Sequence, residues 1–264
     1  MTPELLFLCG VGAASGLVAG LVGLAGGIVI VPALTWIYGP QALHTAIVIS
    51  WFSVMFNSVG AAANQWRIRT VPERAQLWRG ARWYLLGAAL ATPVIAMGAT
   101  QFRGLVDQQA VAVLQLCLAL VMLFPVKDGG RVPRVHPVRD ASFGGLIGTV
   151  STVIGVGGGS YTIAYFVYGA GSRFRDAIAT ANFAGLTVGV LSVAGYLCSV
   201  LLLGSGAQDA AGGPISSWGI AAMVLAGGLA APLGGMLSAR LPVRALRQLL
   251  VLALVGCAAR LLWM

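Results

Sequence analysis

Long stretches without a single charge constrain this chain more than any other feature of its sequence. After Glu4, no aspartate, glutamate, lysine or arginine occurs before Arg67, and only 9% of the 264 residues are charged. A soluble domain carries about 25%. A helix needs ~20 residues to cross a bilayer, and segments close to or above this length cover residues 5–37, 41–66, 83–102, 108–126, 141–170, 177–203, 215–239 and 243–264. The sequence therefore predicts an all-α polytopic membrane protein that contacts the lipid bilayer.

Two glycine clusters interrupt these apolar segments. Gly155-Val-Gly-Gly-Gly-Ser160 lies within 141–170, and Gly23-Leu-Ala-Gly-Gly27 lies 132 residues earlier within 5–37. Glycine costs a helix interior about 1 kcal/mol relative to alanine. Close helix packing through small residues is one interpretation. A helix break at a binding site is the other, because irregular backbone at membrane depth is tolerated where it lines a cavity or is buried in protein. The density of glycines in the second cluster favours a break.

The basic residues predict how the segments cross the membrane. Arginine and lysine concentrate in 67–82, in 127–140 and around Arg240–Arg247, whereas 204–217 holds only Asp209. Basic loops favour the cytoplasmic side, and eight simple crossings cannot place all three there. The conflict disappears if 141–170 and 5–37 are re-entrant, each a pair of half-helices broken at its glycines. Each half then contains one re-entrant or discontinuous helix plus three transmembrane helices, and the second half is inverted, as in many transporters.

Residue matches also indicate an internal duplication. Gly23, Gly26 and Gly27 align with Gly155, Gly158 and Gly159 at an offset of 132, and 87–93 matches 226–232 at an offset of 139. We therefore expect a first transmembrane repeat over 1–126, a basic cytoplasmic linker over 127–140 and a second repeat over 141–264.

The glycine clusters are also the candidate binding site. A break exposes backbone N–H groups at the start of the next half-helix, where the helix dipole favours negative charge. Two such ends facing each other at the midplane would hold a small anion without a buried arginine. The helix after each break carries a polar face, which either lines the pathway or forms interhelical hydrogen bonds. The candidate substrate-binding residues are Gly23, Gly26, Gly27, Ser50, Asn57, Gly155, Gly157, Gly158, Gly159, Ser160, Thr180 and Asn182.

Other functions find little support in the sequence. Walker A, HExxH and paired-carboxylate patterns are absent, so we expect no enzyme activity, catalytic residue, metal site or cofactor. The basic residues sit in short loops, which indicates topology and not nucleic-acid binding. His44 is interpreted as a surface residue, with a proton carrier as the alternative. The four cysteines are interpreted as buried small side chains, with a sulfur carrier as the alternative, and they are Cys9, Cys117, Cys198 and Cys257.

The chain resembles the sulfite exporter TauE/SafE family. The resemblance rests on Gly20–Pro32 (GLVGLAGGIVIVP), on its echo Gly155–Ser160, and on Ala46–Ser50 and Ala177–Asn182. It implies a secondary transporter of the bacterial inner membrane that exports small sulfur-containing anions, such as sulfite, thiosulfate or short organosulfonates. In one departure from the repeat, Ala25 stands where the second cluster has Gly157. A cysteine-based sulfur carrier, a non-transporting accessory subunit and a passive channel are the alternatives. The anion, the direction of transport, a coupling proton and a homo-oligomeric state are left open.

Overall fold

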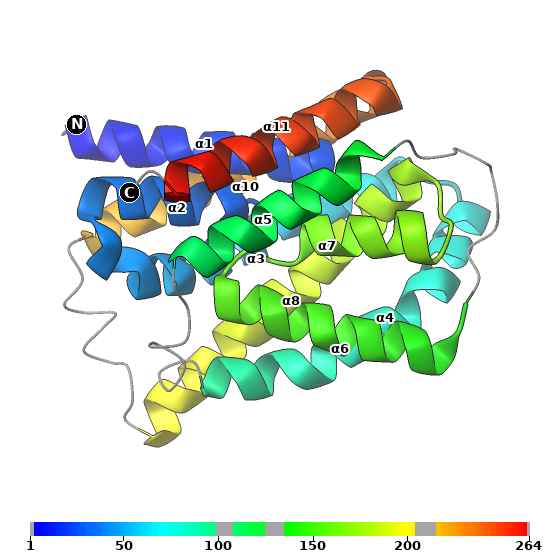
Figure 1. Cartoon of the computed structure of the whole chain (residues 1–264), viewed down its shortest axis with the longest axis horizontal. Coiled ribbons are helices and arrows are strands. Elements are labelled where there is room, and N and C mark those ends of the chain that lie inside the picture. Colours follow the sequence, from blue (N-terminus) through cyan, green and yellow to red (C-terminus); the bar gives the residue numbers. More distant parts are fainter. Residues whose placement is uncertain (1–2, 99–107, 125–134, 204–214, 263–264) are drawn as a thin grey trace.

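The structure, a computed structural model, describes residues 3–98, 108–124, 135–203 and 215–262 (Figure 1). These residues form helices and no strands, which confirms the all-α class. Within the described ranges, four helical segments are long and apolar enough to cross a membrane: Glu4–Val22, Pro40–Arg67, Phe174–Leu202 and Ser217–Arg240. The helices are α1 (Pro3–Val22), α2 (Gly27–Tyr38), η1 (Pro40–Ala42), α3 (Leu43–Arg67), α4 (Val71–Met97), α5 (Gln108–Leu123), α6 (Pro137–Ile154), α7 (Gly159–Ala164), the π-helical η2 (Tyr165–Gly169), α8 (Phe174–Leu203), α10 (Ser217–Arg240) and α11 (Val243–Leu262).

The basic stretch 67–82, expected as a loop, is mostly helical. Only residues 68–70 connect α3 to α4, which begins at Val71. The physical reason is a capping box: the Thr70 backbone N–H and hydroxyl both lie 2.8 Å from the Glu73 carboxylate, and Pro72 occupies the first turn. Threonine followed three residues later by glutamate starts a helix. Residues 137–140 of the expected linker likewise form the first turn of α6. Residues 125–134 and 204–214 lie outside the described residues.

Two seams of small residues bring helix backbones into contact. Along α1, β-carbons on Gly12 and Gly16 would overlap the backbone carbonyls of Met223 and Gly227 in α10. Glycine at these positions therefore allows the close approach that lipid-embedded helices use in place of a hydrophobic driving force.

The second seam joins α6 to α4. A β-carbon on Gly144 would overlap the carbonyl of Tyr84, and one on Gly148 would lie 3.1 Å from the Ala88 Cα. Contact positions increase together along both helices, so α4 and α6 run parallel, as α1 and α10 do.

Hydrogen bonds gather three of the turns at one end of the molecule. Arg69 pairs with Asp176 at 3.1 Å, and the Arg175 side chain donates to the carbonyl of Leu241 at 3.1 Å. The turns after α3, before α8 and after α10 therefore lie together, as their shared positive charge predicts. The Tyr38 hydroxyl donates to Glu4 at 2.6 Å, so the end of α2 lies beside the start of α1.

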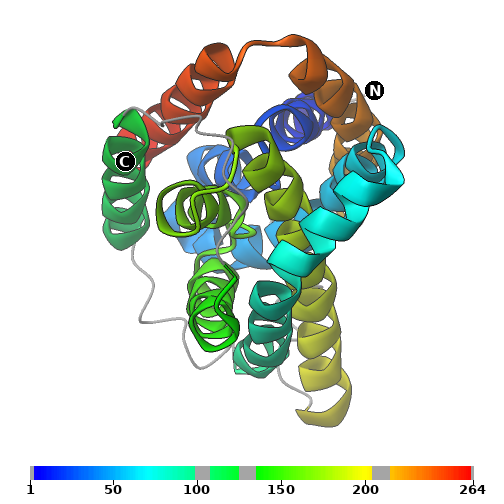
Figure 2. The same cartoon turned by 90° about the vertical axis from the view of Figure 1, so that its right-hand side faces the viewer.

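α5 and α11 lie side by side along one flank (Figures 1 and 2). Residues of α11 spaced four apart are fully buried, and they belong to the same hydrophobic core cluster as the buried face of α5. They are Leu246, Leu250, Leu254 and Ala258. This pair flanks the part of the bundle that contains both glycine clusters.

Candidate functional site

The chain leaves helical geometry at both glycine clusters. α1 ends at Val22 and α2 begins at Gly27, and α6 ends at Ile154 and α7 begins at Gly159. The residues with positive φ repeat at the same offset of 132, with φ values of 72°, 57° and 83° at Gly23, Ala25 and Gly26, and of 75°, 75° and 72° at Gly155, Gly157 and Gly158. Glycine adopts this region without steric cost. The predicted helix breaks are therefore confirmed in both halves.

The two breaks cross each other in direct backbone contact. A β-carbon on Gly27 would overlap the carbonyl oxygen of Gly155, and reciprocally one on Gly159 would overlap that of Gly23. Residues 23–27 and 155–159 are all buried. The candidate glycines, which the sequence places 132 residues apart, thus form a single feature at the centre of the bundle.

Ala25 and Gly157 meet between these contacts. A β-carbon on Gly157 would lie 2.8 Å from the Ala25 Cβ, so only one of the two facing positions has room for a methyl group. Ala25 is the one non-glycine residue with positive φ among the described residues. The left-handed conformation costs an alanine roughly 1–2 kcal/mol. Its methyl group is completely buried, and it fills the space that the missing side chain of Gly157 leaves.

α3 holds the second break from the side. The Ser50 hydroxyl lies 2.6 Å from the carbonyl oxygens of Gly155 and of Ile47. The indole N–H of Trp51, itself buried, donates to the Thr152 carbonyl at 3.1 Å. These bonds satisfy carbonyls at the end of α6, where the last turn lacks intrahelical partners. Ser50, predicted as a substrate ligand, thus has a structural contact in this conformation.

α8 lies against the first break in the corresponding way. A β-carbon on Gly23 would lie 3.0 Å from the Ile178 carbonyl, and one on Gly185 would lie 2.9 Å from the Ala25 Cβ. Asn182 lies between these two contact positions, four residues after Ile178 and three before Gly185, so it occupies the same face of α8. Asn182 is completely buried.

Buried polar atoms without a hydrogen-bond partner occur at several places among the described residues, and some belong to residues beside the crossing. Asn182 has no hydrogen-bond partner for either amide atom, and neither has the Ser160 hydroxyl in the first turn of α7. From α3, the Ser58 hydroxyl, which would lie 2.7 Å from a β-carbon on Gly185, and the Asn57 carbonyl oxygen are also without partners among the described residues. Each such group costs about 1–3 kcal/mol when it is buried without a hydrogen bond, so a cluster of them indicates a place that binds water or a ligand.

The remaining predicted polar residues make bonds within the protein. The Thr180 hydroxyl donates to the Asp176 carbonyl at 3.0 Å, one turn back in α8. The Asn57 amide donates to the Ser15 hydroxyl at 2.8 Å, close to Gly26. Sequence reasoning missed Ser58, which lies about 100° from Asn57 around the helix and therefore outside the predicted polar face. It also missed Ser15, whose setting between glycines is typical of a packing seam.

The charged groups lie away from the crossing. Asp140 is the one buried charged residue among those described. It lies in the first turn of α6, at the end of the stretch 127–140 that the sequence assigns to a basic linker. It accepts hydrogen bonds from the Tyr165 hydroxyl, from the Arg139 guanidinium at 3.2 Å and from the His136 backbone N–H at 2.9 Å. The Arg139 guanidinium offsets its charge, and the Tyr165 and His136 groups stabilise it through hydrogen bonds; the Tyr165 contact is one that sequence spacing does not reveal.

Among the described residues, the cysteines and the potential metal ligands lie outside the crossing of the two breaks. Cys117 and Cys198 are exposed on α5 and α8, and Cys9 and Cys257 are half-buried on α1 and α11. The interpretation of all four as buried side chains is therefore wrong, because Cys117 and Cys198 lie on outward-facing sides of their helices. All four are unpaired and none lies in a break. The described residues contain no group of histidines, cysteines and carboxylates that could hold a metal ion.

Comparison with known proteins agrees with this architecture. The family model described as "Sulfite exporter TauE/SafE" matches residues 8–261. A "Probable membrane transporter protein" of Haemophilus influenzae is similar, with 27% identity over 200 residues that cover 72% of each chain. No solved structure matches the chain. Because the family model spans nearly the whole sequence, the chain belongs to the TauE/SafE sulfite exporter family of membrane transporters, and it is not an enzyme.

Proposed function

We propose that this protein is a secondary transporter that exports a small sulfur-containing anion, such as sulfite, thiosulfate or a short organosulfonate, across the bacterial inner membrane. The substrate binds where the two helix breaks cross. The observation that carries this proposal is the cluster of buried, unpartnered polar groups at the crossing: Asn57, Ser58, Ser160 and Asn182. The family name adds the class of anion.

The chemistry of these groups suits an oxyanion. The Ser58 and Ser160 hydroxyls and the Asn182 amide are neutral donors. The first N–H groups of α2 and α7 lack an acceptor one turn back in the helix, although the Val29 N–H donates to the Gly26 carbonyl at 3.1 Å. Sulfite, thiosulfate and sulfonate oxygens accept such bonds. Hydrogen bonds to a charged group contribute about 1.5–3 kcal/mol each, so a few neutral donors suffice to hold a desolvated anion. If an arginine held the anion instead, release of the anion would require an ion pair to break.

The packing supports two inverted repeats. The α1–α10 seam and the α6–α4 seam are equivalent at the offsets of the sequence duplication: Gly12 meets Met223 as Gly144 meets Tyr84. The Tyr38–Glu4 hydrogen bond holds the end of α2 beside the start of α1. The Tyr165–Asp140 hydrogen bond likewise holds η2 beside the start of α6. We infer from these contacts that each broken helix is re-entrant and that one enters from each side of the membrane.

Alternating access follows from this arrangement. Glycines occupy the reciprocal contacts Gly27–Gly155 and Gly159–Gly23, and the methyl group of Ala25 lies between the two breaks. A contact made almost entirely by backbone offers few side chains that would have to repack when one repeat rocks against the other. Rocking would open the crossing to one side of the membrane and then to the other, as transporters built from inverted repeats do.

An isosteric substitution separates function from folding. Asn182→Leu removes two polar atoms that have no protein partner, so the stability should be unchanged or higher. Anion flux into proteoliposomes should nevertheless fall about tenfold or more, because an anion loses a charge-assisted hydrogen bond. The matched control is Thr187→Val on the same helix, whose hydroxyl donates to its own helix at the Phe183 carbonyl, at 3.0 Å, and which should transport normally. Normal flux through Asn182→Leu would contradict the site.

A screen of anions identifies the substrate. Flux of sulfite, thiosulfate, sulfate, sulfoacetate and taurine is measured with the purified protein in liposomes, with and without a pH gradient. Transport of one or more sulfur anions supports the proposal, and dependence on the gradient identifies proton coupling. No flux of any of them would favour a non-transporting accessory subunit.

A further inference from the structure

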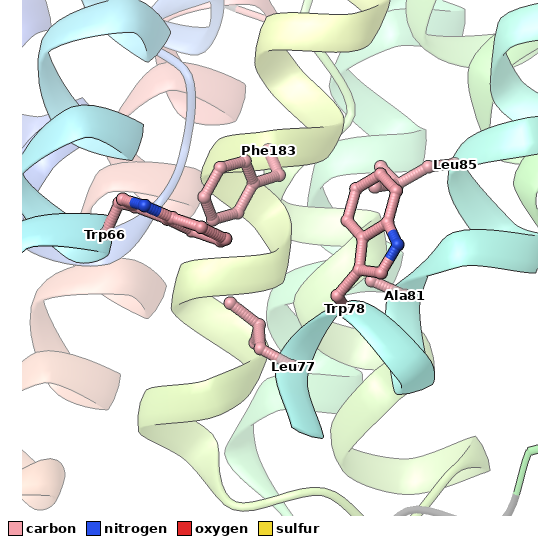
Figure 3. A pocket seen from close by; sticks show the side chains of 6 residues that line it. All are labelled: Trp66, Leu77, Trp78, Ala81, Leu85 and Phe183. Carbon is pink, nitrogen blue, oxygen red and sulfur yellow. The ribbon is translucent and has the colours of Figure 1, made fainter. Parts of the chain in front are cut away.

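An apolar groove of about 260 Å³ lies on the outer surface between α3, α4 and α8 (Figure 3). All of its lining residues are apolar or aromatic: Trp66, Leu77, Trp78, Ala81, Leu85 and Phe183. The indoles of Trp66 and Trp78 are 41% and 55% exposed. In Figure 3, Trp66 and Phe183 lie on one side of the groove, and Trp78 and Leu85 lie on the other.

The side chain of Arg74 lies at one end of this groove. The Arg74 guanidinium carbon lies 5.3 Å from the centroid of the Trp66 ring, and its Nε is buried without a hydrogen-bond partner. The two acidic residues nearby in the structure are already engaged, since Glu73 caps α4 through Thr70 and Asp176 pairs with Arg69. Arg74 therefore retains capacity to bind an anion.

Arg74 and the groove share one face of α4. The residues at positions 74, 77, 78, 81 and 85 are spaced as one helical stripe, with the arginine at the N-terminal end and only apolar side chains beyond it. The stripe spans twelve residues, from 74 to 85, and is about 16 Å long at 1.5 Å per residue.

The position of the groove in the membrane agrees with this polarity. Basic residues mark the cytoplasmic side, and tryptophans concentrate at the boundary between headgroups and hydrocarbon. Arg79 and Arg82 are exposed on other faces of α4, at the same level as the groove residues. The groove therefore lies at the boundary between headgroups and hydrocarbon of the inner leaflet, with Arg74 at its headgroup end.

We propose that this groove is a specific site for an anionic glycerophospholipid, with one acyl chain between Trp66 and Trp78 and the headgroup phosphate on Arg74. Basic pockets between transmembrane helices on the cytoplasmic side bind anionic headgroups in this way. The site is distinct from the crossing of the two breaks and does not depend on which anion is transported.

The test measures retained lipid by native mass spectrometry of the full chain in a neutral detergent. The protein is titrated with phosphatidylglycerol, with phosphatidylcholine of the same acyl chains, and with glycerol 3-phosphate. The wild type should retain phosphatidylglycerol in preference to phosphatidylcholine and should not retain glycerol 3-phosphate. Arg74→Gln should lower the affinity for phosphatidylglycerol about fivefold, the worth of one arginine near an anionic lipid, and Trp78→Ala should weaken both lipids.

Arg244→Gln is the matched control, because Arg244 is an exposed arginine of α11, whose main partner is α5. It should leave phosphatidylglycerol retention unchanged. Equal retention of the two lipids by the wild type would overturn the proposal. The proposal would also be overturned if Arg244→Gln lost as much phosphatidylglycerol retention as Arg74→Gln. A dimer that forms with loss of bound lipid, and that Trp78→Ala abolishes, would overturn it as well. Retention of glycerol 3-phosphate alone would indicate a free phosphate site and would also overturn it.

Discussion

The contact between Ala25 and Gly157 makes a quantitative prediction about the crossing of the two breaks. In Gly157→Ala, the new alanine must adopt the backbone φ of 75° that residue 157 has in the fold, which costs about 1–2 kcal/mol of stability. It also lies 2.8 Å from the Ala25 Cβ and 2.8 Å from the Val54 Cγ1, and overpacking of this kind costs about 1–3 kcal/mol. The smaller freedom of alanine in the unfolded chain returns about 0.5–1 kcal/mol, so the variant should lose about 1–4.5 kcal/mol of unfolding free energy.

The opposite change should cost little. In Ala25→Gly, release of the left-handed alanine returns about 1–2 kcal/mol. The loss of a buried methyl costs about 0.8 kcal/mol, and the extra freedom of glycine in the unfolded chain costs about 0.5–1 kcal/mol. The sum is close to zero.

The double variant Ala25→Gly/Gly157→Ala moves the methyl group from one side of the crossing to the other. The contact between the two β-carbons is then absent, although the Val54 contact remains. The double variant should therefore be about 1–2 kcal/mol more stable than Gly157→Ala, which is within the range of coupling energies for residues in contact.

Denaturant titration in mixed micelles measures all four proteins as a double-mutant cycle. Additive effects within about 0.5 kcal/mol would refute the direct contact of the two breaks. A neutral Gly157→Ala would refute it as well.

Three further predictions concern other parts of the molecule. Gly12→Ala should destabilise the protein by about 1–3 kcal/mol because its methyl would overlap the Met223 carbonyl, whereas Gly10→Ala, with open space around it, should be neutral or stabilising; thermal unfolding in detergent ranks the two. Hydrogen bonds from the Thr70 N–H and hydroxyl lower the pKa of the exposed Glu73 carboxyl, outside the membrane-spanning part. The cap should thus stabilise the start of α4 above the unfolded pKa of about 4.3, and lose this effect as the pH falls through the lower folded pKa. The protection of the amides in that turn, relative to intrinsic exchange at the same pH, should fall at acid pH, and Glu73→Gln should remove this pH step. Replacement of all four cysteines by alanine should retain anion flux, and loss of flux with normal folding would favour a cysteine-based sulfur carrier.

The sequence predicted the break positions because the physics there is local. Glycines at positions requiring positive φ identify a break without knowledge of the rest of the fold, and the repeat at an offset of 132 identifies the second from the first. The start of α4 was also readable, since Thr70 and Glu73 form a capping box, but the positive charge of the stretch was interpreted as a loop.

The hydrogen-bond partner of each buried polar side chain could not be predicted from the sequence. Ser50 and Asn182 are equivalent at the repeat offset, yet Ser50 donates to backbone carbonyls whereas Asn182 has no partner. This difference depends on contacts between segments over a hundred residues apart. The same holds for Asp140, whose burial depends on Tyr165 from the returning half of the broken helix.

The most direct test of the account is hydrogen–deuterium exchange of the purified protein with and without a sulfur anion, with sulfite as the first probe and thiosulfate and sulfoacetate as the others. The crossing of the two breaks is the proposed site, so a bound anion should slow exchange of the first-turn amides of α2 and α7, around Gly27 and Ser160, and the Asn182→Leu variant should lose this protection. Protection of both breaks by at least one of the anions is the predicted result. Protection confined to other segments, or protection that persists in Asn182→Leu, would contradict the site.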